Sequence, residues 1–597
     1  MKVFKDNISI HQQGFEKLDS KVFWVSWLRV IAFISFFGLA GYLFYDREML
    51  FGFGSTMIGF ILFGVIVNRH KRLEFKRKQE EILIQINQEE LKRLDNNLSD
   101  FDGGSRFIDD SHSYTSDLDV FGKNSLFQLL NRSFTPTGQS KLADWLRSPQ
   151  VKPVIEERQE AVAELGTRLV WSQSFQALAR HNVILKSEEM YEGFQQWLAQ
   201  PPLTKLKANV VPAIILGLVN VVAVSLSFAG IIPWQLIFFP VALSVFYLKN
   251  FQHIVQKAAG DSYQIAKLLQ SYGNLITAIS SQSFTSPFMV CHQSALSEPT
   301  SALKEIDHFS FLMDTLNNRE NMLYWLFNTI FLIDIHLLVK LEQWKIKNAE
   351  NFNRWIDSIS EVEAVNGVAA FAHAHPEYAT PEISNDATVF GAHQLGHPLI
   401  RQTERVCNDF ELNDESKIGI ITGSNMSGKS TFLRSIGINL LLAQIGSPVC
   451  AERLKVSPIG IFTSMRTSDN LEESVSSFYA ELRRIERLIK IINNGGSVFF
   501  MLDEILKGTN THDRQLGAKS LIKQLMKESC MGLVSTHDIA LGQLGEEGDS
   551  LNNWHFSSDL KAGQLLFDYQ IKEGVCRSFN ASQLMAQIGI KLEGDPN

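Results

Sequence analysis

Hydrophobic residues near the N-terminus form two long runs that are almost free of charge. The first run covers residues 23–45, where Arg29 is the one charged side chain, and the second covers residues 49–67. Each run is long enough to cross the roughly 30 Å hydrocarbon core of a bilayer as a helix. Because only a short polar link separates the runs, the pattern predicts a transmembrane hairpin over residues 23–68, after an N-terminal tail of residues 1–22.

A cluster of basic residues follows this hairpin directly. Its members are Arg69, Lys71, Arg72, Lys76, Arg77 and Lys78. Since basic residues beside a membrane span stay in the cytoplasm, this end of the hairpin and the N-terminal tail are predicted to be cytoplasmic. The basic cluster is therefore first a topology signal, and only second a patch for DNA or anionic lipid. The pattern favours a multi-pass protein of a bacterial inner membrane.

A second pair of apolar runs lies near the middle of the chain, over residues 209–228 and 231–248. Lysines flank the pair on both sides, so it predicts a second transmembrane hairpin, residues 205–250, with the same orientation as the first. The sequence thus predicts four transmembrane helices. Buried helices of a soluble domain are the alternative for this pair, and its three prolines weaken the membrane interpretation without excluding it.

A third apolar run, residues 323–339, differs from the others because it contains Asp334 and His336. Charged or titratable groups inside an apolar helix are more often hydrogen-bonded within a protein core. This run therefore predicts a buried core helix with two satisfied polar groups.

The remaining segments divide into a helical region and an α/β region. Residues 69–114 read as a charged helix followed by a Gly- and Ser-containing linker. Helical patterns cover residues 115–204 and 251–384, so the second hairpin interrupts one helical domain. Residues 385–597 are predicted as one domain, in which strand and helix patterns alternate from Lys417, as is typical of an α/β nucleotide-binding domain.

A glycine-rich loop follows a buried-strand pattern at residues 418–422. The loop reads Gly423-Ser424-Asn425-Met426-Ser427-Gly428-Lys429-Ser430-Thr431, and a helical pattern follows it. Strand, loop and helix in this order indicate a P-loop, whose backbone N–H groups and helix N-terminus bind phosphates. We expect Lys429 to reach the β- and γ-phosphates of the nucleotide, and the Ser430 hydroxyl to bind Mg²⁺.

Two later strand patterns end in residues that could act on a nucleotide bound at this loop. Residues 498–502 are apolar and lead to Asp503 and Glu504. We expect Asp503 to hold Mg²⁺ through water, and Glu504 to polarise the water that attacks ATP. A further strand, residues 532–535, leads to His537, which is either a sensor of the γ-phosphate or a structural histidine.

These motifs resemble those of the MutS family. The Asn-Met pair inside the phosphate loop, the block of residues 503–511 and the Ser-Thr-His of residues 535–537 are similar to family motifs. Residues 476–481 resemble the family's Ser-Thr-Phe signature, and residues 117–149 resemble its helical core. The resemblance implies a P-loop domain of the MutS and ABC type, beside a helical domain similar to the MutS core.

The resemblance also implies an activity and an assembly. The domain would bind ATP and Mg²⁺ and hydrolyse ATP, with Ser430 and Asp503 at the metal. The catalytic residues that it implies are Glu504, His537 and Lys429. Two chains of the family sandwich two nucleotides, so it implies a homodimer in which Ser476 and Ser477 contact the partner's ATP.

Several features depart from the family pattern. Membrane helices occupy the N-terminal end, and we find neither a mismatch-reading domain nor its Phe-x-Glu wedge. Arg405 stands where the family has an adenine-stacking aromatic residue, and Ser427 replaces a glycine. The sequence ends soon after Ile590, so we expect the family's C-terminal dimer clasp to be absent or minimal.

Composition limits the function further. The net charge of −8 over 597 residues gives no global basic field for nucleic acid. The five cysteines are scattered without a Cys-x-x-Cys pair, which argues against a disulfide framework or a zinc site.

Three functions are compatible with these features. The first is a membrane-anchored MutS-like ATPase that acts on DNA, as in mismatch repair, and the second is the same ATPase remodelling a membrane or a protein without DNA. An ABC-type transporter is the weakest, because the signature is not of the transporter type. The second hairpin interrupts the helical region that carries the DNA clamp in the family. We therefore expect ATP-driven motion to act on this hairpin, with DNA contact peripheral or absent.

Overall fold

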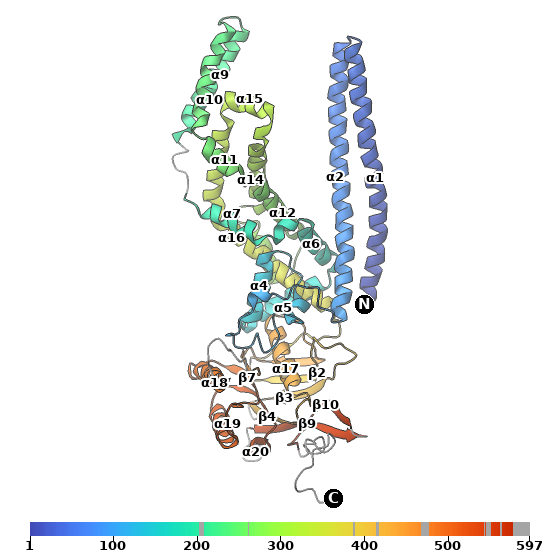
Figure 1. The fold of residues 1–597 in the computed structure, drawn as a ribbon, viewed down its shortest axis with the longest axis vertical. Helices are drawn as coiled ribbons and strands as arrows, with labels where there is room; N and C mark the ends of the chain where they lie inside the picture. The colour runs from blue at the N-terminus through green and yellow to red at the C-terminus, as the bar shows by residue number, and fades with distance from the viewer. Residues whose placement is uncertain are drawn as a thin grey trace, which may run out of the picture.

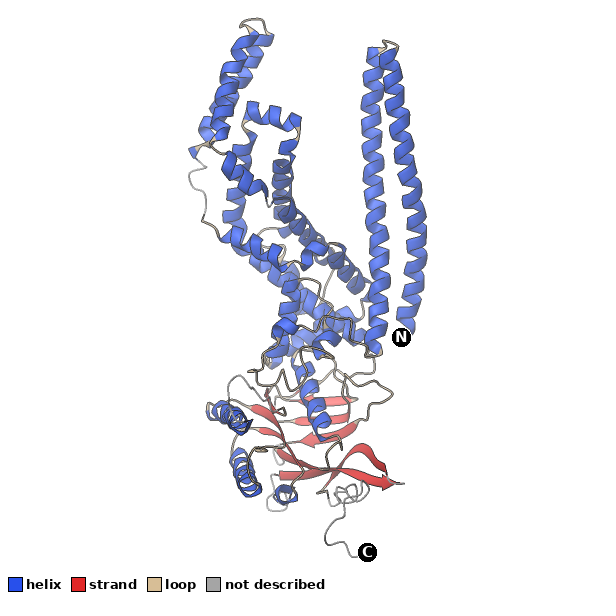
Figure 2. Cartoon of the chain, viewed as in Figure 1, coloured by secondary structure: helices blue, strands red, loops and turns tan. Residues whose placement is uncertain are grey.

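The protein is elongated, and its parts follow one another along the long axis of the computed structural model (Figure 1). An α/β domain forms one end, a helical core lies in the middle, and two apolar hairpins form the other end. Within the described residues, every strand lies after residue 381 (Figure 2). The structure describes residues 1–201, 208–260, 262–385, 388–413, 417–466, 477–542, 544, 551–561 and 564–576.

The N-terminal hairpin consists of α1 (Lys2–Tyr45) and α2 (Met49–Leu94), which run antiparallel. Helices of 44 and 46 residues, at about 1.5 Å per residue, are much longer than a bilayer core is thick. Residues 2–22, which the sequence analysis assigned to a tail, are the first half of α1. The polar halves of the two helices are joined by contacts such as His11 Nδ1 to Glu80 Oε2 at 2.7 Å. The apolar halves pack through aromatic rings.

The helical core is built around α16 (Ile333–Ala374), a helix of 42 residues. It packs against α4 (Pro136–Arg147), α5 (Lys152–Gly166) and α14 (Ala302–Asn317). The other core helices are α3 (Leu126–Leu130), α6 (Leu169–His181), α7 (Glu188–Ala199), α11 (Gln252–Gly260), α12 (Ser262–Ser280) and α13 (Pro287–Ala295). Local signals set some boundaries: the Thr135 hydroxyl accepts the Gly138 N–H at the start of α4. The sequence-predicted helical domain is therefore present.

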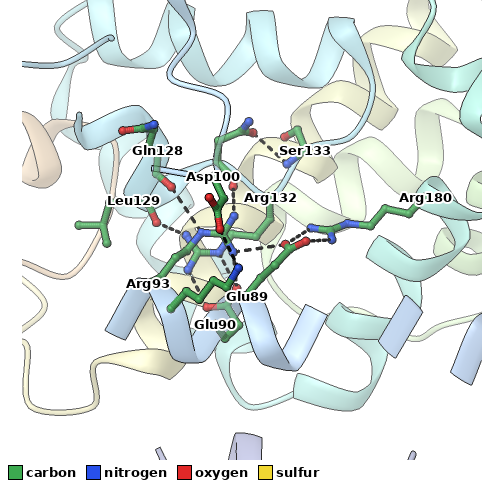
Figure 3. Close-up of polar contacts among 11 residues, drawn as sticks. Glu89, Glu90, Arg93, Asp100, Gln128, Leu129, Arg132, Ser133 and Arg180 are labelled. Carbon is green, nitrogen blue, oxygen red and sulfur yellow. Dashed lines mark hydrogen bonds and ion pairs between the residues drawn. The ribbon is translucent and has the colours of Figure 1, made fainter. Parts of the chain in front are cut away.

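A buried cluster of charged residues joins the polar end of α2 to this core (Figure 3). Glu90 of α2 accepts hydrogen bonds from Arg132 at 2.8 and 3.0 Å, and from Arg93 at 3.3 Å. Beside it, the Glu89 carboxylate accepts two bonds of 2.8 Å from Arg180 of α6. The N-terminal hairpin is thus fixed to the core by charge-assisted hydrogen bonds.

The second apolar hairpin consists of α9 (Val210–Phe228), the short 3-10 helix η3 (Trp234–Ile237) and α10 (Phe238–Lys249). Helices α1, α2 and α9 are long and apolar enough to cross a membrane, whereas the apolar segment that ends with α10 is shorter. The four expected spans therefore correspond to three long helices and one shorter one. Both hairpins lie at the end of the molecule opposite the α/β domain (Figure 1).

The third apolar run does not form the single buried helix expected from the sequence. It breaks at Leu332, whose φ of 52° is left-handed, into α15 (Met322–Phe331) and the start of α16. The two helices meet at 83°, and much of α15 is exposed. Asp334 is hydrogen-bonded as expected, to Tyr324 at 2.6 Å and to Asn328 at 2.9 Å. The expectation of one buried helix was wrong because a continuous apolar pattern does not reveal a helix break.

The C-terminal domain contains two sheets. The larger has the strand order β10-β9-β4-β8-β7-β6, in which all neighbours are parallel except β9 and β10. The smaller has the order β1-β5-β2-β3. The strands are β1 (Glu382–Ile383), β2 (Phe390–Leu395), β3 (Asn408–Leu412), β4 (Ile418–Thr422), β5 (Arg453–Val456), β6 (Gly460–Ser464), β7 (Val498–Asp503), β8 (Met531–Thr536), β9 (Leu551–Lys561) and β10 (Gln564–Glu573). Helix α17 (Lys429–Gln444) covers one face of the larger sheet, and α18 (Ser477–Asn493) and α19 (Thr511–Leu525) cover the other.

Candidate nucleotide-binding site

The phosphate loop joins the end of β4 to the first turn of α17. All five residues of β4 are buried, which fixes the start of the loop within the sheet. Gly428 has a φ of 108°, in the left-handed region that favours glycine, and a Cβ there would meet the Tyr569 ring at 3.0 Å. The helix begins at Lys429, so the loop lies at its positive N-terminus. This arrangement binds anions such as phosphate.

The ammonium group of Lys429 lies inside the loop. Its Nζ donates to the carbonyl oxygens of Gly423 at 2.8 Å and Ser424 at 3.0 Å. Burial lowers the pKa of Lys429, and the nearby carboxylates Glu504 and Asp503 oppose this lowering only in part. An anion bound in the loop would therefore stabilise the charged form of this lysine.

Two hydroxyl groups converge on the carboxylate of Asp503 at the end of β7. Ser430 Oγ donates to Asp503 Oδ2 at 2.5 Å, and the Ser535 hydroxyl donates to the other oxygen. A hydroxyl next to a carboxylate is the donor set that Mg²⁺ uses in P-loop proteins. The two predicted metal ligands therefore lie together and fit a magnesium ion.

Glu504 lies beside this pair with a left-handed φ of 53°. Its carboxylate contacts Lys507 Nζ at 3.1 Å and His537 Nδ1 at 3.5 Å. Burial raises the pKa of Glu504, but the hydrogen bond from Lys507 and the nearby His537 and Lys429 lower it below its usual value overall. The structure thus brings the three predicted catalytic residues together, with Glu504 ionised at neutral pH.

A cavity of about 590 Å³ opens beside the phosphate loop. Its walls on the loop side include Asn425, Met426, Ser427, Gly428, Lys429, Ser430, Thr431 and Glu504. The hydroxyl groups of Ser424 and Ser427 are buried here without a hydrogen-bond partner among the described residues. Unpaired hydroxyls at a positive helix terminus can donate to phosphate oxygens, so the site fits a nucleoside triphosphate.

The rest of the cavity wall differs from the sequence-based expectation. Arg405 does not line it, because its guanidinium donates to the Ile400 carbonyl at 2.8 Å and lies over the Tyr378 ring. Tyr569 lines it instead, from a bulge in β10 where its φ is 54°. Asn408 holds this bulge by donating to the Tyr569 carbonyl at 3.1 Å. Sequence reasoning missed Tyr569 because neither its neighbours nor its spacing from the loop forms a motif.

The signature segment lies only partly within the described residues. Ser476 is outside them, and Ser477 is the first residue of α18, with no side-chain position described. Glu481 on the same helix is buried and accepts the backbone N–H of Leu506, in the loop that follows Glu504. The signature helix is therefore attached to the loop that carries the candidate catalytic carboxylate.

Asp117 connects the signature helix to the rest of the molecule. It is 1% exposed and accepts hydrogen bonds from Thr463 at 2.7 Å and Arg484 of α18 at 2.9 Å. It also accepts the backbone N–H groups of Met465 and Arg466, which follow β6. The segment that precedes the helical core is thus docked on the α/β domain next to the signature helix.

Comparison with known proteins agrees with this geometry. A family model described as MutS domain V matches residues 419–589. The DNA mismatch repair protein MutS of Staphylococcus haemolyticus (strain JCSC1435) is 29% identical over 271 residues, which cover 44% of this chain and 30% of that protein. MutS of Staphylococcus aureus (strain JH9) is 29% identical over 269 residues, with the same coverage. The matched region thus spans less than a third of these relatives.

The match begins within β4 and includes the phosphate loop, the Asp503–Glu504 pair and His537. MutS domain V is an ATPase domain, in agreement with the cavity and its donor groups. The similarity to the MutS family is therefore clearest in this C-terminal domain, which matches MutS domain V.

Proposed function

We propose that this chain is a membrane-anchored MutS-like ATPase that hydrolyses ATP at a dimer interface and transmits the resulting motion to its apolar hairpins. One observation carries this proposal. The nucleotide site and the apolar hairpins lie at opposite ends of the molecule, and α16 runs between the two regions (Figure 1). A rigid helix of 42 residues, about 63 Å long, transfers a small rotation at one end into a larger displacement at the other.

At the nucleotide site, each group has a distinct role. The N–H groups of the phosphate loop and Lys429 would hold the phosphates, and Ser430 and Asp503 would hold Mg²⁺, which would supply charge neutralisation at the phosphate oxygens. Glu504 accepts a hydrogen bond from the attacking water and orients it, and His537 lies 3.5 Å from the Glu504 carboxylate. The ring of Tyr569 covers the base.

Dimerisation would complete the site. In this arrangement Ser476 and Ser477 contact the nucleotide held by the second copy. Because Glu481 ties the signature helix to the loop after Glu504, binding of the partner's ATP would also change the position of the catalytic carboxylate. Because Asp117 is hydrogen-bonded to Arg484 of α18 and precedes the helical core, the same movement would also shift the core.

The membrane part of the proposal rests on the apolar helices and on charge. Most apolar side chains of α1, α2 and α9 are exposed, which is unfavourable in water and expected in lipid. The basic cluster of residues 69–78 lies on α2 between the apolar half and the core. By the positive-inside rule, this charge supports a cytoplasmic position of the ATPase domain.

Cysteine labelling tests this topology. In inverted and right-side-out vesicles that contain the full chain, a cysteine at Arg47 or Gln235 is expected to react with an impermeant maleimide from outside the cell. A cysteine at Ser99 is expected to react only from the cytoplasmic side, because it follows α2. The native Cys291 is exposed and is replaced by serine in all variants. If only the cysteine at position Ser99 reacted from outside, the orientation would be the reverse of the one proposed.

ATP-dependent movement of the second hairpin tests the transmission. We expect a spin-label pair at Phe239 on α10 and Lys527 after α19 to change its distance distribution by several ångströms on ATP addition in the Glu504→Gln background. The reason is that α16 contacts α9 and α15 near its start, and the chain leads directly from its end into the α/β domain. A second pair within the α/β domain, at Lys527 and Glu411 of β3, serves as the control and should not move.

DNA binding is the second candidate function, favoured by the names of the relatives. Those proteins are DNA mismatch repair proteins, and the match covers the region of shared ATPase chemistry. If the Phe239–Lys527 distance is unchanged by ATP while the chain binds mismatched duplex tightly and specifically, the DNA function replaces the proposed one. A different outcome is DNA binding that shows no preference for mismatches and disappears between about 50 and 200 mM salt. Such salt dependence is expected when basic side chains only neutralise phosphates, so it would indicate peripheral contact.

A further inference from the structure

Helix α15 lies across the ends of α14 and α16, at the side of the second hairpin (Figure 1). It packs against both α9 and α10. Its axis turns away from α16 by 83°, so it does not continue the long helix. The helical core thus ends in a transverse helix, α15, that contacts the apolar hairpin.

The outer face of α15 is apolar and exposed. Met322 is 84% exposed, and Leu323 and Trp325 are each 61% exposed. Leu326, Phe327 and Phe331 extend the same surface. The helix contains no charged residue. Exposed apolar side chains in this number are unfavourable in water and mark a site that contacts lipid or another protein.

The polar groups at the helix break are all directed inward. Asn220 in the middle of α9 is fully buried, and its amide donates to the Ile330 carbonyl at 2.9 Å and to Ser244 at 2.8 Å. The Leu332 N–H donates to the Asn328 carbonyl at 2.8 Å. A break in a helix exposes carbonyl groups that lipid cannot satisfy, and here Asn220 of α9 and the Leu332 N–H satisfy those of Ile330 and Asn328.

The charged residue nearest the break is also neutralised. The Asp334 carboxylate accepts hydrogen bonds from Tyr324 and Asn328, and Arg319 lies 3.1 Å from it. A carboxylate with three partners can lie next to hydrocarbon, whereas an unpaired one cannot. The interior side of α15 is therefore polar and satisfied, and its outer side is purely apolar.

We propose that α15 is a third membrane element, a re-entrant helix whose outer face contacts lipid acyl chains. We assign lipid to this face because α15 packs against α9 and α10, whose exposed surface is also apolar. Asn220 of α9 holds α15 to the hairpin through its hydrogen bond to Ile330. The inference rests on the proposed membrane anchoring and extends it: α14 and α16 end inside the bilayer, so their movement acts directly on lipid. A second copy of the chain covering α15 is the competing occupant.

Spin-label accessibility in the reconstituted full chain tests this assignment. Nitroxides replace Leu323 or Phe327 on α15, Phe239 on α10 as the lipid control, and Val170 on α6 as the water control, with Cys291 and Cys407 changed to serine. The two controls are 83% and 81% exposed. At Leu323 and Phe327 we expect the nitroxide to collide several-fold more often with oxygen than with a water-soluble nickel chelate. The lipid control Phe239 should show the same ratio, and the water control Val170 the reverse.

The other outcomes separate the two proposals. If Phe239 reports lipid while the α15 labels report water, α15 lies outside the bilayer and this inference is wrong, but anchoring stands. If the α15 labels are shielded from both reagents, a second copy covers the helix, which also overturns it. If Phe239 itself reports water, the membrane anchoring fails. Each labelled variant must hydrolyse ATP at the parent rate, which shows that it is folded.

A measurement on the unsubstituted chain guards against perturbation by the labels. In vesicles that contain a lipid with a diazirine in its acyl chain, illumination should attach lipid to the tryptic peptide of residues 320–340, which contains the whole of α15. The adducts are expected on residues 322–331. Adducts on the α9 peptides without any on residues 320–340 would contradict the proposal.

Discussion

The Glu504→Gln variant is expected to hydrolyse ATP roughly 10²–10⁴-fold more slowly than the parent, the range for loss of a general base. ATP and Mg²⁺ binding should be retained, because the phosphate loop, Ser430 and Asp503 are unchanged. The contacts of Glu504 with Lys507 and His537 keep the carboxylate ionised and in place, and an amide cannot accept a proton from water. Phosphate release under steady-state conditions and binding of a fluorescent ATP analogue measure the two effects separately.

Two further variants give this result its meaning. Glu486→Gln changes an exposed carboxylate on α18 that pairs with Lys490 at 2.6 Å, and it should leave turnover unchanged. Lys429→Ala should weaken nucleotide binding itself, because it removes the cation inside the loop. Equal hydrolysis by Glu504→Gln and the parent would remove Glu504 from the mechanism.

The phosphate-binding half of the site was predictable because its chemistry is local in sequence. Gly428 must be a glycine to adopt its left-handed φ, and Lys429 and Ser430 follow directly at the helix start. The strand that ends at Asp503 is uniformly apolar because it is buried on both faces of a parallel sheet. The two motifs lie far apart in sequence, but parallel strands place their carboxyl ends at one edge of the sheet, where Ser430 meets Asp503.

The base-binding half was not predictable in the same way. Tyr569 reaches the cavity through a strand bulge that Asn408 stabilises from another sheet, and no local pattern encodes such a long-range contact. Arg405 was assigned to this wall by position alone, but its guanidinium finds a nearer acceptor in the Ile400 carbonyl. A local sequence motif cannot predict the position of a side chain that is set by hydrogen bonds to distant parts of the chain.

The apolar segments show the same limit. Hydrophobicity located every apolar helix, because the signal is summed over many residues. It did not reveal the break at Leu332, since one left-handed residue changes the course of the chain without changing the pattern. The first half of α1 was assigned to a tail because its charged residues show no long apolar face, yet pairing with α2 through contacts such as His11–Glu80 makes it helical.

The joint between α2 and the core is a second place where a large effect is expected. Glu90 is 3% exposed and lies between Arg93 and Arg132, which are also buried (Figure 3). Burial lowers the pKa of Arg93 to about 9, with the positive charge of Arg132 acting in the same direction. For Glu90, burial raises the pKa, but the two arginines outweigh it and hold the value below 4.5. The cluster is stable only while the carboxylate is charged.

Glu90→Gln should therefore leave the buried Arg132 without this counter-charge and Arg93 with only Glu89, 3.7 Å away. The expected destabilisation of the joint is about 3–5 kcal/mol, the usual cost of breaking a buried ion pair. Because each 1.4 kcal/mol is about a factor of ten, amide hydrogen exchange over residues 86–94 and 128–132 should accelerate roughly 10²–10³-fold at pH 7. The matched control is Glu89→Gln, whose carboxylate is 29% exposed and pairs with Arg180 at 2.8 Å and with Arg93 at 3.7 Å. Its effect should be no more than about 1 kcal/mol, as for other partly exposed pairs.

The pH dependence of the same measurement identifies the charge as the cause. A carboxyl group whose pKa is lowered in the folded state stabilises that state above its ordinary value of 4.5, and the stabilisation is lost as pH falls through the lower folded pKa. The parent should therefore approach the exchange behaviour of Glu90→Gln when the pH is lowered below 4.5, and differ from it most at neutral pH. A difference between the two that persists unchanged at low pH would assign the effect to lost packing or hydrogen bonding of the side chain, and not to its charge.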